Sequence, residues 1–276
     1  MTRGRILLIA TGMQGIGKSF LSLNQALYQA YKAKHKNKCL IFETNIGEYK
    51  ECEIDGTIHK IPQIGHNDII RYGNHPKPDV RRISPCSKKG VPMSDIDTEN
   101  LLIKVLNEFR GGSIIAEDLN KIFGDNLPDA ITGALCNVRH RNCDLTLHLQ
   151  SVGRIGVKML QNVKVVRYHY QLEPIENSRD KLKGETEIFM IAEKLVNEQF
   201  TNGNRYFCVY IYREIKKIRG KFSPRMFSVA IQEYISENSR VLRALLAKVD
   251  NRGKRINTYE TALLAKTKEL FLRYYG

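Results

Sequence analysis

The sequence predicts an α/β fold in which helices flank a mainly parallel sheet, followed by a basic and mostly helical C-terminal region. About the first 170 residues alternate strand-like apolar runs with segments of helical period, which is typical of a parallel sheet covered on both faces. A glycine-rich loop joins the first strand to the first helix. Residues 205–276 carry 16 Lys and Arg against 6 Asp and Glu, so +10 of the net charge of +15 lies there.

The composition is that of a folded domain. A chain of 276 residues can bury a sizeable core, and 42% apolar and 26% charged residues are ordinary values. No segment approaches the ~18 continuous apolar residues of a membrane span, and Ile6–Ala10 is too short for a signal peptide. We therefore expect the protein to stay where it is made, and its positive charge to attract nucleic acid or an anionic membrane surface.

The six cysteines contain no C-x-x-C pair, and Cys39 and Cys208 lie in apolar, strand-like runs. We therefore expect reduced and mostly buried thiols. The alternative is a zinc site drawn from the series Cys52, His59, His66, His75 and Cys86. The intervals in that series match no familiar ligand spacing.

The N-terminal elements follow the order strand, loop, helix, strand. Ile6–Ala10 is an apolar run that predicts a buried strand, and Phe20–Tyr31 has the apolar spacing of a helix. A basic turn then leads to a second buried strand, Cys39–Phe42. Residues 47–93 hold five of the eight prolines and show no clear period, so we expect a long irregular excursion there.

Regular elements return after the excursion. Ser94–Phe109 presents one apolar helical face and is followed by two glycines that stop it. The later elements expected are a strand at Ser113–Ala116, a helix opened by Pro128, strands at Leu145–Leu149 and Val163–Tyr168, a helix near Glu185–Phe200, a strand at Tyr206–Tyr212, and helices at Ser239–Val249 and Thr258–Tyr274. We place the core at residues 1–204 and the basic region at residues 205–276.

The segment from Gly12 to Ser19 fits the phosphate-binding pattern G-x-x-x-x-G-K-[ST]. Between a strand and a helix, backbone N–H groups and the helix dipole converge on phosphate oxygens, Lys18 adds positive charge, and the Ser19 hydroxyl can meet Mg²⁺. An ordinary glycine turn is the alternative. The pattern predicts a site for ATP and Mg²⁺ with the binding residues Gly12, Gln14, Gly15, Ile16, Gly17, Lys18, Ser19 and Phe20.

Two acidic residues, Glu117 and Asp118, directly follow the strand Ser113–Ala116. A phosphate-binding loop of this kind needs a carboxylate at the end of a neighbouring strand to hold the magnesium shell. We predict that Glu117 serves that shell through water and that Asp118 polarises the attacking water. The alternative is a solvated acidic turn.

Three further residues are candidates for catalysis. Gln150 follows the strand Leu145–Leu149, where its amide could sense the γ-phosphate or orient water, although a polar strand end explains it equally well. Arg139 and Arg141 flank His140 at the end of a helix, where they could reach the nucleotide of a neighbouring subunit. Basic residues that complement a helix C-terminus are the alternative for either arginine.

In this order the pieces resemble the FtsK/HerA superfamily of ring-forming DNA translocases, and especially its branch of viral genome-packaging ATPases. The resemblance covers about residues 5–170. Beside the phosphate loop it rests on Leu40-Ile-Phe-Glu43 followed by Gly47-Glu48-Tyr49, on Glu117-Asp118, on Arg139-His140-Arg141, on Gln150, and on Asn162 leading to Arg167. The glutamine after the strand matters most, since small-molecule kinases have no need of it.

The resemblance implies a RecA-like core, a homo-oligomeric ring of six or five subunits, and ATP hydrolysis coupled to movement of DNA. It implies a trans role for Arg139 or Arg141, a viral portal or capsid vertex as a further partner, and a place in the host cytoplasm or the virion. The family's acidic pair usually reads Asp then Glu. Here the order is reversed, which leaves the roles of Glu117 and Asp118 open.

The basic region lies outside the resemblance. Its two charge clusters lie beside glycines and are expected to contact DNA phosphates: Lys216, Lys217, Arg219 and Lys221, then Arg252, Lys254 and Arg255. A portal, an anionic membrane surface and plain solubility are alternatives for this region. For the whole chain the alternatives are an assembly or export ATPase like those of filamentous phages, a P-loop kinase acting on a small molecule, and a nucleic-acid-binding protein that does not hydrolyse nucleotide.

Overall fold

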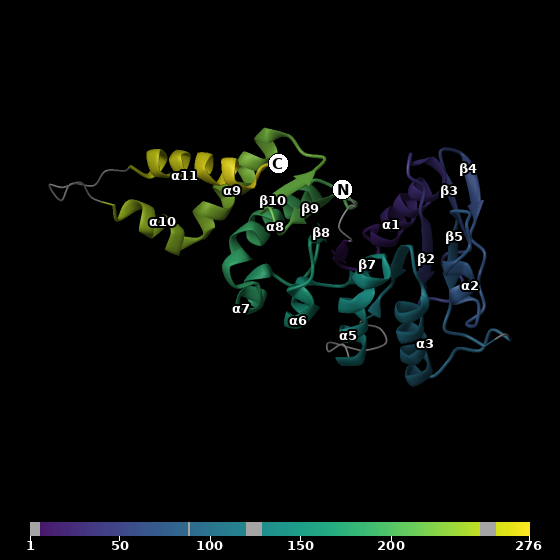
Figure 1. Cartoon of the computed structure of the whole chain (residues 1–276). Coiled ribbons are helices and arrows are strands. Elements are labelled where there is room, and N and C mark those ends of the chain that lie inside the picture. Colours follow the sequence, from purple (N-terminus) through teal and green to yellow (C-terminus); the bar gives the residue numbers. More distant parts are fainter. Residues whose placement is uncertain (1–5, 88, 120–128, 249–257) are drawn as a thin grey trace. The chain divides into compact units, whose positions relative to one another are not determined.

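A computed structural model describes residues 6–87, 89–119, 129–248 and 258–276 (Figure 1). The chain forms two compact units, Met1–Val165 (unit 1) and Val166–Gly276 (unit 2). Strands that are mostly parallel in unit 1 and antiparallel in unit 2, flanked by helices, confirm the predicted fold class. The division lies well before the expected boundary at residue 205, because helix α8 (Thr186–Thr201) packs on later elements, β9 (Cys208–Tyr212) and α9 (Pro224–Glu237).

Unit 1 contains five parallel strands in the order β1-β7-β6-β2-β5. They are β1 (Leu7–Thr11), β2 (Lys38–Phe42), β5 (Val80–Ile83), β6 (Gly112–Ala116) and β7 (Asp144–Leu149). The strands are nearly continuous apolar runs because both faces of a parallel sheet are covered. Parallel strands all end at one edge, here called the carboxyl edge. The residues that directly follow four of the strands at this edge are Gly12, Glu43, Glu117 and Gln150.

Helices flank these strands. The longer ones in unit 1 are α1 (Lys18–Leu27), which continues into a π-helical turn at Tyr28–Lys32, α3 (Asp95–Glu108) and α5 (Asp129–Asn137); α6 (Val157–Leu160) is a single turn. The predicted start of α3 is confirmed, since the Ser94 side chain accepts a hydrogen bond from the Asp97 N–H as an N-cap. Pro128, expected to open α5, lies outside the described residues.

The excursion at residues 47–93 is more regular than expected. It contains a hairpin of β3 (Glu51–Ile54) and β4 (Thr57–Lys60), a short helix α2 (Ile69–Gly73), and strand β5, which joins the main sheet beside β2. The sequence of β5, Val-Arg-Arg-Ile, has no apolar run because one of its arginines, Arg82, is buried in an ion pair. Sequence periodicity does not show a strand of this composition.

Unit 2 combines strands with a group of helices. Strand β8 (Val165–His169) begins at the boundary, and β9 pairs with β10 (Lys217–Gly220) in antiparallel fashion. The remaining helices are α7 (Arg179–Leu182), α9, α10 (Ser239–Leu246) and α11 (Tyr259–Tyr274). Helix α9, not expected from the sequence, starts with Ser223 as N-cap and Pro224 in its first turn, and it packs against α8 and α11.

Two features are absent from the described residues. No helix in this part of the chain is both long and apolar enough to cross a membrane. No three His, Cys, Asp or Glu side chains in this part of the chain come together as a metal site. Cys39, Cys52, Cys86 and Cys143 are buried free thiols, and Cys208 is half-buried.

Candidate active site

The phosphate loop connects β1 to α1 at the carboxyl edge of unit 1. The Gly12 N–H donates to the Leu149 carbonyl at 3.2 Å, which ties the start of the loop to the end of β7. Gly15 and Gly17 have φ angles of 80° and 79°, left-handed conformations that favour glycine. Gly17 is the N-cap of α1, so the free N–H groups of the first helical turn face the loop. Gln14 and Phe20 are exposed, and Ile16 is buried.

Lys18 lies in the first turn of α1 and is 7% exposed. Its ammonium donates hydrogen bonds to the carbonyl oxygens of Gly12 at 2.5 Å and Met13 at 2.7 Å. These carbonyls carry only partial negative charge. A phosphate anion in the loop is therefore a stronger partner for the ammonium than the loop's own backbone.

Ser19 and Glu117 meet although 98 residues separate them in sequence. The Ser19 hydroxyl donates to Glu117 Oε2 at 2.8 Å, and the carboxylate is almost fully buried. A hydroxyl and a carboxylate are hard oxygen donors of the kind Mg²⁺ prefers, and Mg²⁺ in phosphate sites uses few protein ligands beside water and phosphate oxygens. The pair therefore fits the predicted magnesium site.

The electrostatics around Glu117 keep it ionised. Burial raises its pKa, but attraction to His148 and hydrogen bonds from His148, Tyr49 and Ser19 outweigh burial, so the pKa is lowered. Burial and the negative charge of Glu117 together raise the pKa of the buried Tyr49, which therefore keeps its proton. The site thus contains a negative carboxylate beside a neutral phenol.

The structure separates the two acidic residues. Glu117 contacts Ser19, whereas Asp118 is half-buried and has a φ of 39°. Left-handed backbone is uncommon for residues other than glycine, although aspartate tolerates it better than most. The turn after β6 therefore gives the two neighbouring carboxylates different surroundings.

Gln150 lies where the sequence places it, at the carboxyl edge and exposed. The residue before it, Leu149, pairs with Thr11 and accepts the hydrogen bond from Gly12. Gln150 therefore follows directly on the residue that anchors the phosphate loop. This position is compatible with contact to a bound nucleotide.

Arg141 takes a different position. It precedes β7 and so lies at the amino edge of the sheet, opposite the phosphate loop of its own subunit. Its guanidinium donates to the Asn107 carbonyl oxygen and, at 3.2 Å, to Asn107 Oδ1, in the last turn of α3. This arrangement favours the helix-end alternative. Arg139 lies in the same short helix, and its side chain is outside the described part of the chain.

The predicted DNA-binding cluster in unit 2 is divided by the structure. Lys216, Arg219 and Lys221 are exposed. Lys217 is half-buried and donates to the carbonyls of Leu272 at 3.1 Å and Tyr275 at 2.8 Å, contacts that stabilise the C-terminal end of α11. The second cluster, Arg252, Lys254 and Arg255, lies outside the described residues.

Four residues of the site were not predicted as site residues, among them Tyr49, whose phenol lies beside Glu117. Ser22 and His148 form polar contacts behind Glu117. Glu43, which the sequence marks only as part of a motif, accepts hydrogen bonds from Arg82 and Ser84 and from the N–H groups of Gly47 and Tyr49, both at 3.2 Å. A histidine inside an apolar strand was the available signal for His148.

We expect Arg82→Ala to destabilise the protein strongly. Glu43 is fully buried, and removal of its arginine partner leaves an uncompensated charge, at a cost of about 3–5 kcal/mol. The neighbouring Arg81 pairs with Asp79 at 2.8 Å with its side chain partly exposed, so Arg81→Ala is the matched control, with a loss of less than about 1 kcal/mol. Urea denaturation of both variants measures the free energy of unfolding. Equal losses in the two variants would contradict a larger stabilising contribution from the buried pair.

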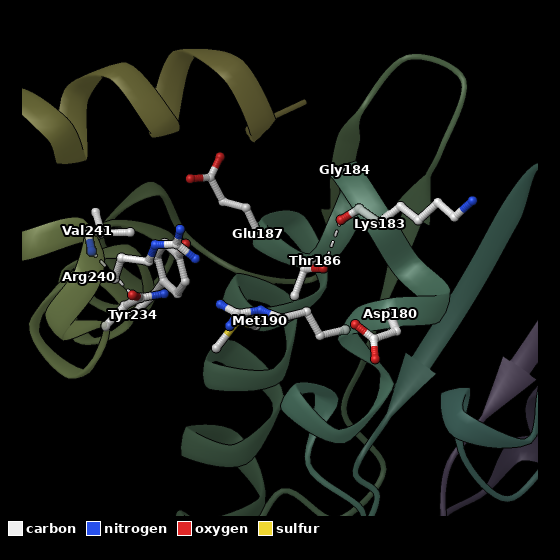
Figure 2. Close-up of a pocket in the computed structure, with 11 residues that line it drawn as sticks. Asp180, Lys183, Gly184, Thr186, Glu187, Met190, Tyr234, Arg240 and Val241 are labelled. Atoms are coloured by element: carbon white, nitrogen blue, oxygen red, sulfur yellow. Dashed lines mark hydrogen bonds between the residues drawn. The ribbon is translucent and has the colours of Figure 1, made fainter. Parts of the chain in front are cut away.

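A separate pocket of about 480 Å³ lies within unit 2, lined by residues of α7, α8, α9 and α10 (Figure 2). Its charged side chains have both signs: Arg179, Lys183 and Arg240 are positive, and Asp180 and Glu187 are negative. Glu187 already accepts a hydrogen bond from the Tyr274 hydroxyl at 2.6 Å. None of the predicted site residues lines this pocket, which therefore has no part in the nucleotide site.

No protein-family model matches the sequence, and no curated protein matches it either. Among solved structures, the genome packaging NTPase B204 from Sulfolobus turreted icosahedral virus 2 in complex with ATP-gammaS superposes with a TM-score of 0.51 and 17% identity, over 78% of this chain and 96% of that one. The fold is that of a P-loop NTPase. The sulfate complex of B204 gives a TM-score of 0.50 and 17% identity, over 78% and 95% of the two chains. In this P-loop NTPase fold, Gly12–Ser19 is the P-loop.

Proposed function

We propose that this protein is an ATP-hydrolysing DNA translocase, a motor ATPase of the viral genome-packaging type within the FtsK/HerA superfamily. The observation that carries hydrolysis is the 2.8 Å contact between Ser19 and Glu117 beside the P-loop. The fold shared with the packaging NTPase B204 supports the packaging role. The sequence motifs named above support the superfamily.

Each residue at the carboxyl edge has a role in this proposal. The P-loop N–H groups and Lys18 hold the β- and γ-phosphates, and Ser19 and Glu117 hold Mg²⁺. The metal, when bound, neutralises charge on the phosphates. Gln150, next to the loop anchor, orients the attacking water or senses the γ-phosphate.

The positions of Glu117 and Asp118 support different roles for the two carboxylates. Glu117 contacts the P-loop serine and is buried, as the magnesium ligand should be. Asp118 comes one residue later, is half-buried and has no part in the contact with Ser19, so we assign it the activation of water. The reversed order of the pair thus leaves the magnesium role with the first residue and the water role with the second.

The proposal includes a homo-oligomeric ring of six or five subunits in which one subunit contributes an arginine to the next. Arg139 is our candidate for that arginine, since the guanidinium of Arg141 is engaged with Asn107. A portal or capsid vertex is the proposed docking partner, in the host cytoplasm or the virion. Anionic membrane contact is the alternative use of the basic surface.

ATP hydrolysis measured with and without duplex DNA tests the proposed function. We expect turnover to rise when DNA is added, and light scattering to show a multimer when nucleotide is present. A monomer whose hydrolysis is indifferent to DNA would contradict translocation and favour the small-molecule kinase. A protein that binds DNA but never hydrolyses ATP would contradict the enzyme assignment itself.

Neutralising the exposed basic residues of unit 2 should weaken DNA binding. Each phosphate contact releases counterions and contributes a slope of about −0.9 to log affinity against log salt on duplex DNA. We expect the triple change Lys216→Gln, Arg219→Gln and Lys221→Gln to make this slope shallower by up to about 2.7 and to leave basal hydrolysis unchanged. Fluorescence anisotropy across a salt series measures the slope.

The control for this experiment is Lys34→Gln with Lys36→Gln, two exposed lysines of unit 1 outside the cluster. We expect it to keep the parental slope. If the triple variant binds DNA as tightly as the parent with the same slope, the cluster has another role, such as contact with a membrane or a portal.

A further inference from the structure

His148 has no role in the proposed function, yet it lies directly behind the magnesium site. It is fully buried on β7, with Nδ1 2.7 Å from Glu117 Oε1 and Nε2 2.7 Å from Ser22 Oγ. We propose that His148 is a positioning residue: it engages one oxygen of Glu117 and thereby aims the other at Mg²⁺. This inference rests on the proposed nucleotide and magnesium site.

The chemistry of Glu117 fixes the direction of its contact with His148. An ionised carboxylate only accepts hydrogen bonds, so the proton between Glu117 and His148 belongs to Nδ1 of the ring. Nε2 lies 2.7 Å from Ser22 Oγ, and a hydroxyl can donate or accept, so Ser22 engages the ring whichever form it takes. The imidazole is therefore held at both of its nitrogens.

The contact joins two buried atoms. Within the described part of the chain, Glu117 Oε1 and His148 Nδ1 are buried, make no hydrogen bond of good geometry to any group, and lie 2.7 Å apart as an ion-pair contact. A buried carboxylate oxygen without a partner is costly, so any rotation of Glu117 away from the ring is opposed. The imidazole thus fixes the plane of the carboxylate.

Both oxygens of Glu117 are tied to the same helix. Ser19 and Ser22 are three residues apart on α1, so they lie on one face of the helix in adjacent turns. Oε2 contacts Ser19 directly, and Oε1 reaches Ser22 through His148. The Ser19 hydroxyl is itself a proposed magnesium ligand, and its oxygen can offer a lone pair to the metal with or without its contact to Glu117. The His148 contact is on the other oxygen and can persist in both states.

If His148 only filled space in the core, its replacement would have a different effect. Replacement of such a residue would change stability but would not single out metal binding. Side chains that orient the residues bound to a metal typically contribute about 10- to 100-fold to metal affinity, which is lost when they are removed. The apparent Mg²⁺ affinity is therefore the informative measurement.

The test compares His148→Asn with His148→Gln in the full-length protein. The Asn amide can donate from nearly the place of Nδ1, whereas the longer Gln amide falls nearer Nε2 and leaves Glu117 without its donor. Binding of a fluorescent ATP analogue is measured in EDTA and across a Mg²⁺ titration. We expect His148→Gln to weaken the apparent Mg²⁺ affinity by about 10- to 100-fold and His148→Asn to restore most of it, with nucleotide affinity in EDTA unchanged in both.

The control is Thr146→Ala, two residues earlier on β7 and partly exposed, which should leave Mg²⁺ affinity unaltered. Ser22→Ala should weaken it, because the ring then loses the polar contact at Nε2 that holds it in place. Equal Mg²⁺ affinity in the Asn and Gln variants would overturn the positioning role while leaving the magnesium site intact. If the parent protein shows no Mg²⁺-dependent tightening of nucleotide binding, the proposed site itself fails and this inference with it.

Discussion

Lys18→Ala is expected to abolish ATP hydrolysis and to weaken nucleotide binding severely. Its ammonium is the only side-chain cation inside the P-loop, and it lies across the loop between the carbonyls of Gly12 and Met13, where a phosphate would meet it. Loss of one such group from a preorganised site typically costs about 10²–10³-fold in turnover. A coupled assay of ATP hydrolysis and titration with a fluorescent ATP analogue measure the two effects.

Lys36→Ala is the matched control, because Lys36 is an exposed lysine elsewhere in unit 1. It should hydrolyse and bind ATP as the parent does. Parental turnover in the purified Lys18→Ala variant would show that Gly12–Ser19 is not the phosphate site, whatever the fold.

Glu117→Gln and Asp118→Asn are expected to lower turnover by different routes. Glu117 contacts Ser19 and His148, so its amide variant should lose the gain in nucleotide affinity that Mg²⁺ brings, together with at least about 10²-fold in turnover. Asp118 stands apart from that contact, so its amide variant should bind Mg²⁺ and ATP almost normally and lose about 10²–10⁴-fold in turnover, as expected of a general base. Nucleotide binding with and without Mg²⁺, measured beside turnover, separates the two.

The opposite pattern would reverse the assignment of the acidic residues, with Asp118 as the magnesium ligand. Parental turnover in both variants would remove the acidic pair from the mechanism altogether. Both proteins should keep the parental unfolding midpoint within the error of the Lys36→Ala control if the losses are catalytic.

The sequence predicts most of the fold because most elements have a strong local period. Apolar runs identify β1, β2, β6 and β7, and helical spacing identifies α1, α3 and α8. Strand β5 is not predicted, because its Arg82 can be buried only through the ion pair with Glu43, a residue distant in sequence. The boundary between the units cannot be located from the sequence, because it depends on the packing of α8 against later elements, which the order of residues alone does not show.

In the candidate site, too, some residues can be predicted from the sequence and others cannot. Lys18, Ser19, Glu117 and Gln150 are predictable because they follow strands or lie in a contiguous motif, and parallel strands bring their ends together. His148 and Lys217 are not, because the role of each depends on a partner chosen by the fold: a carboxylate on the neighbouring strand for one and the end of a helix for the other. Motifs therefore place the residues at strand ends better than the residues whose contacts depend on the fold.

The carboxylate of Glu43 has a consequence for how this protein can vary. It holds the turn after β2 through the backbone N–H groups of Gly47 and Tyr49, not through the side chains between them. Contacts to the backbone do not depend on the side chain between them. A position such as Ile46, which is 45% exposed, should therefore tolerate substitution during evolution or in a mutant library. Glu43 and Arg82 can change only together. Related chains should therefore differ most at exposed turn positions such as Ile46, and keep Glu43, Arg82 and the glycine at position 47, whose φ is 87°.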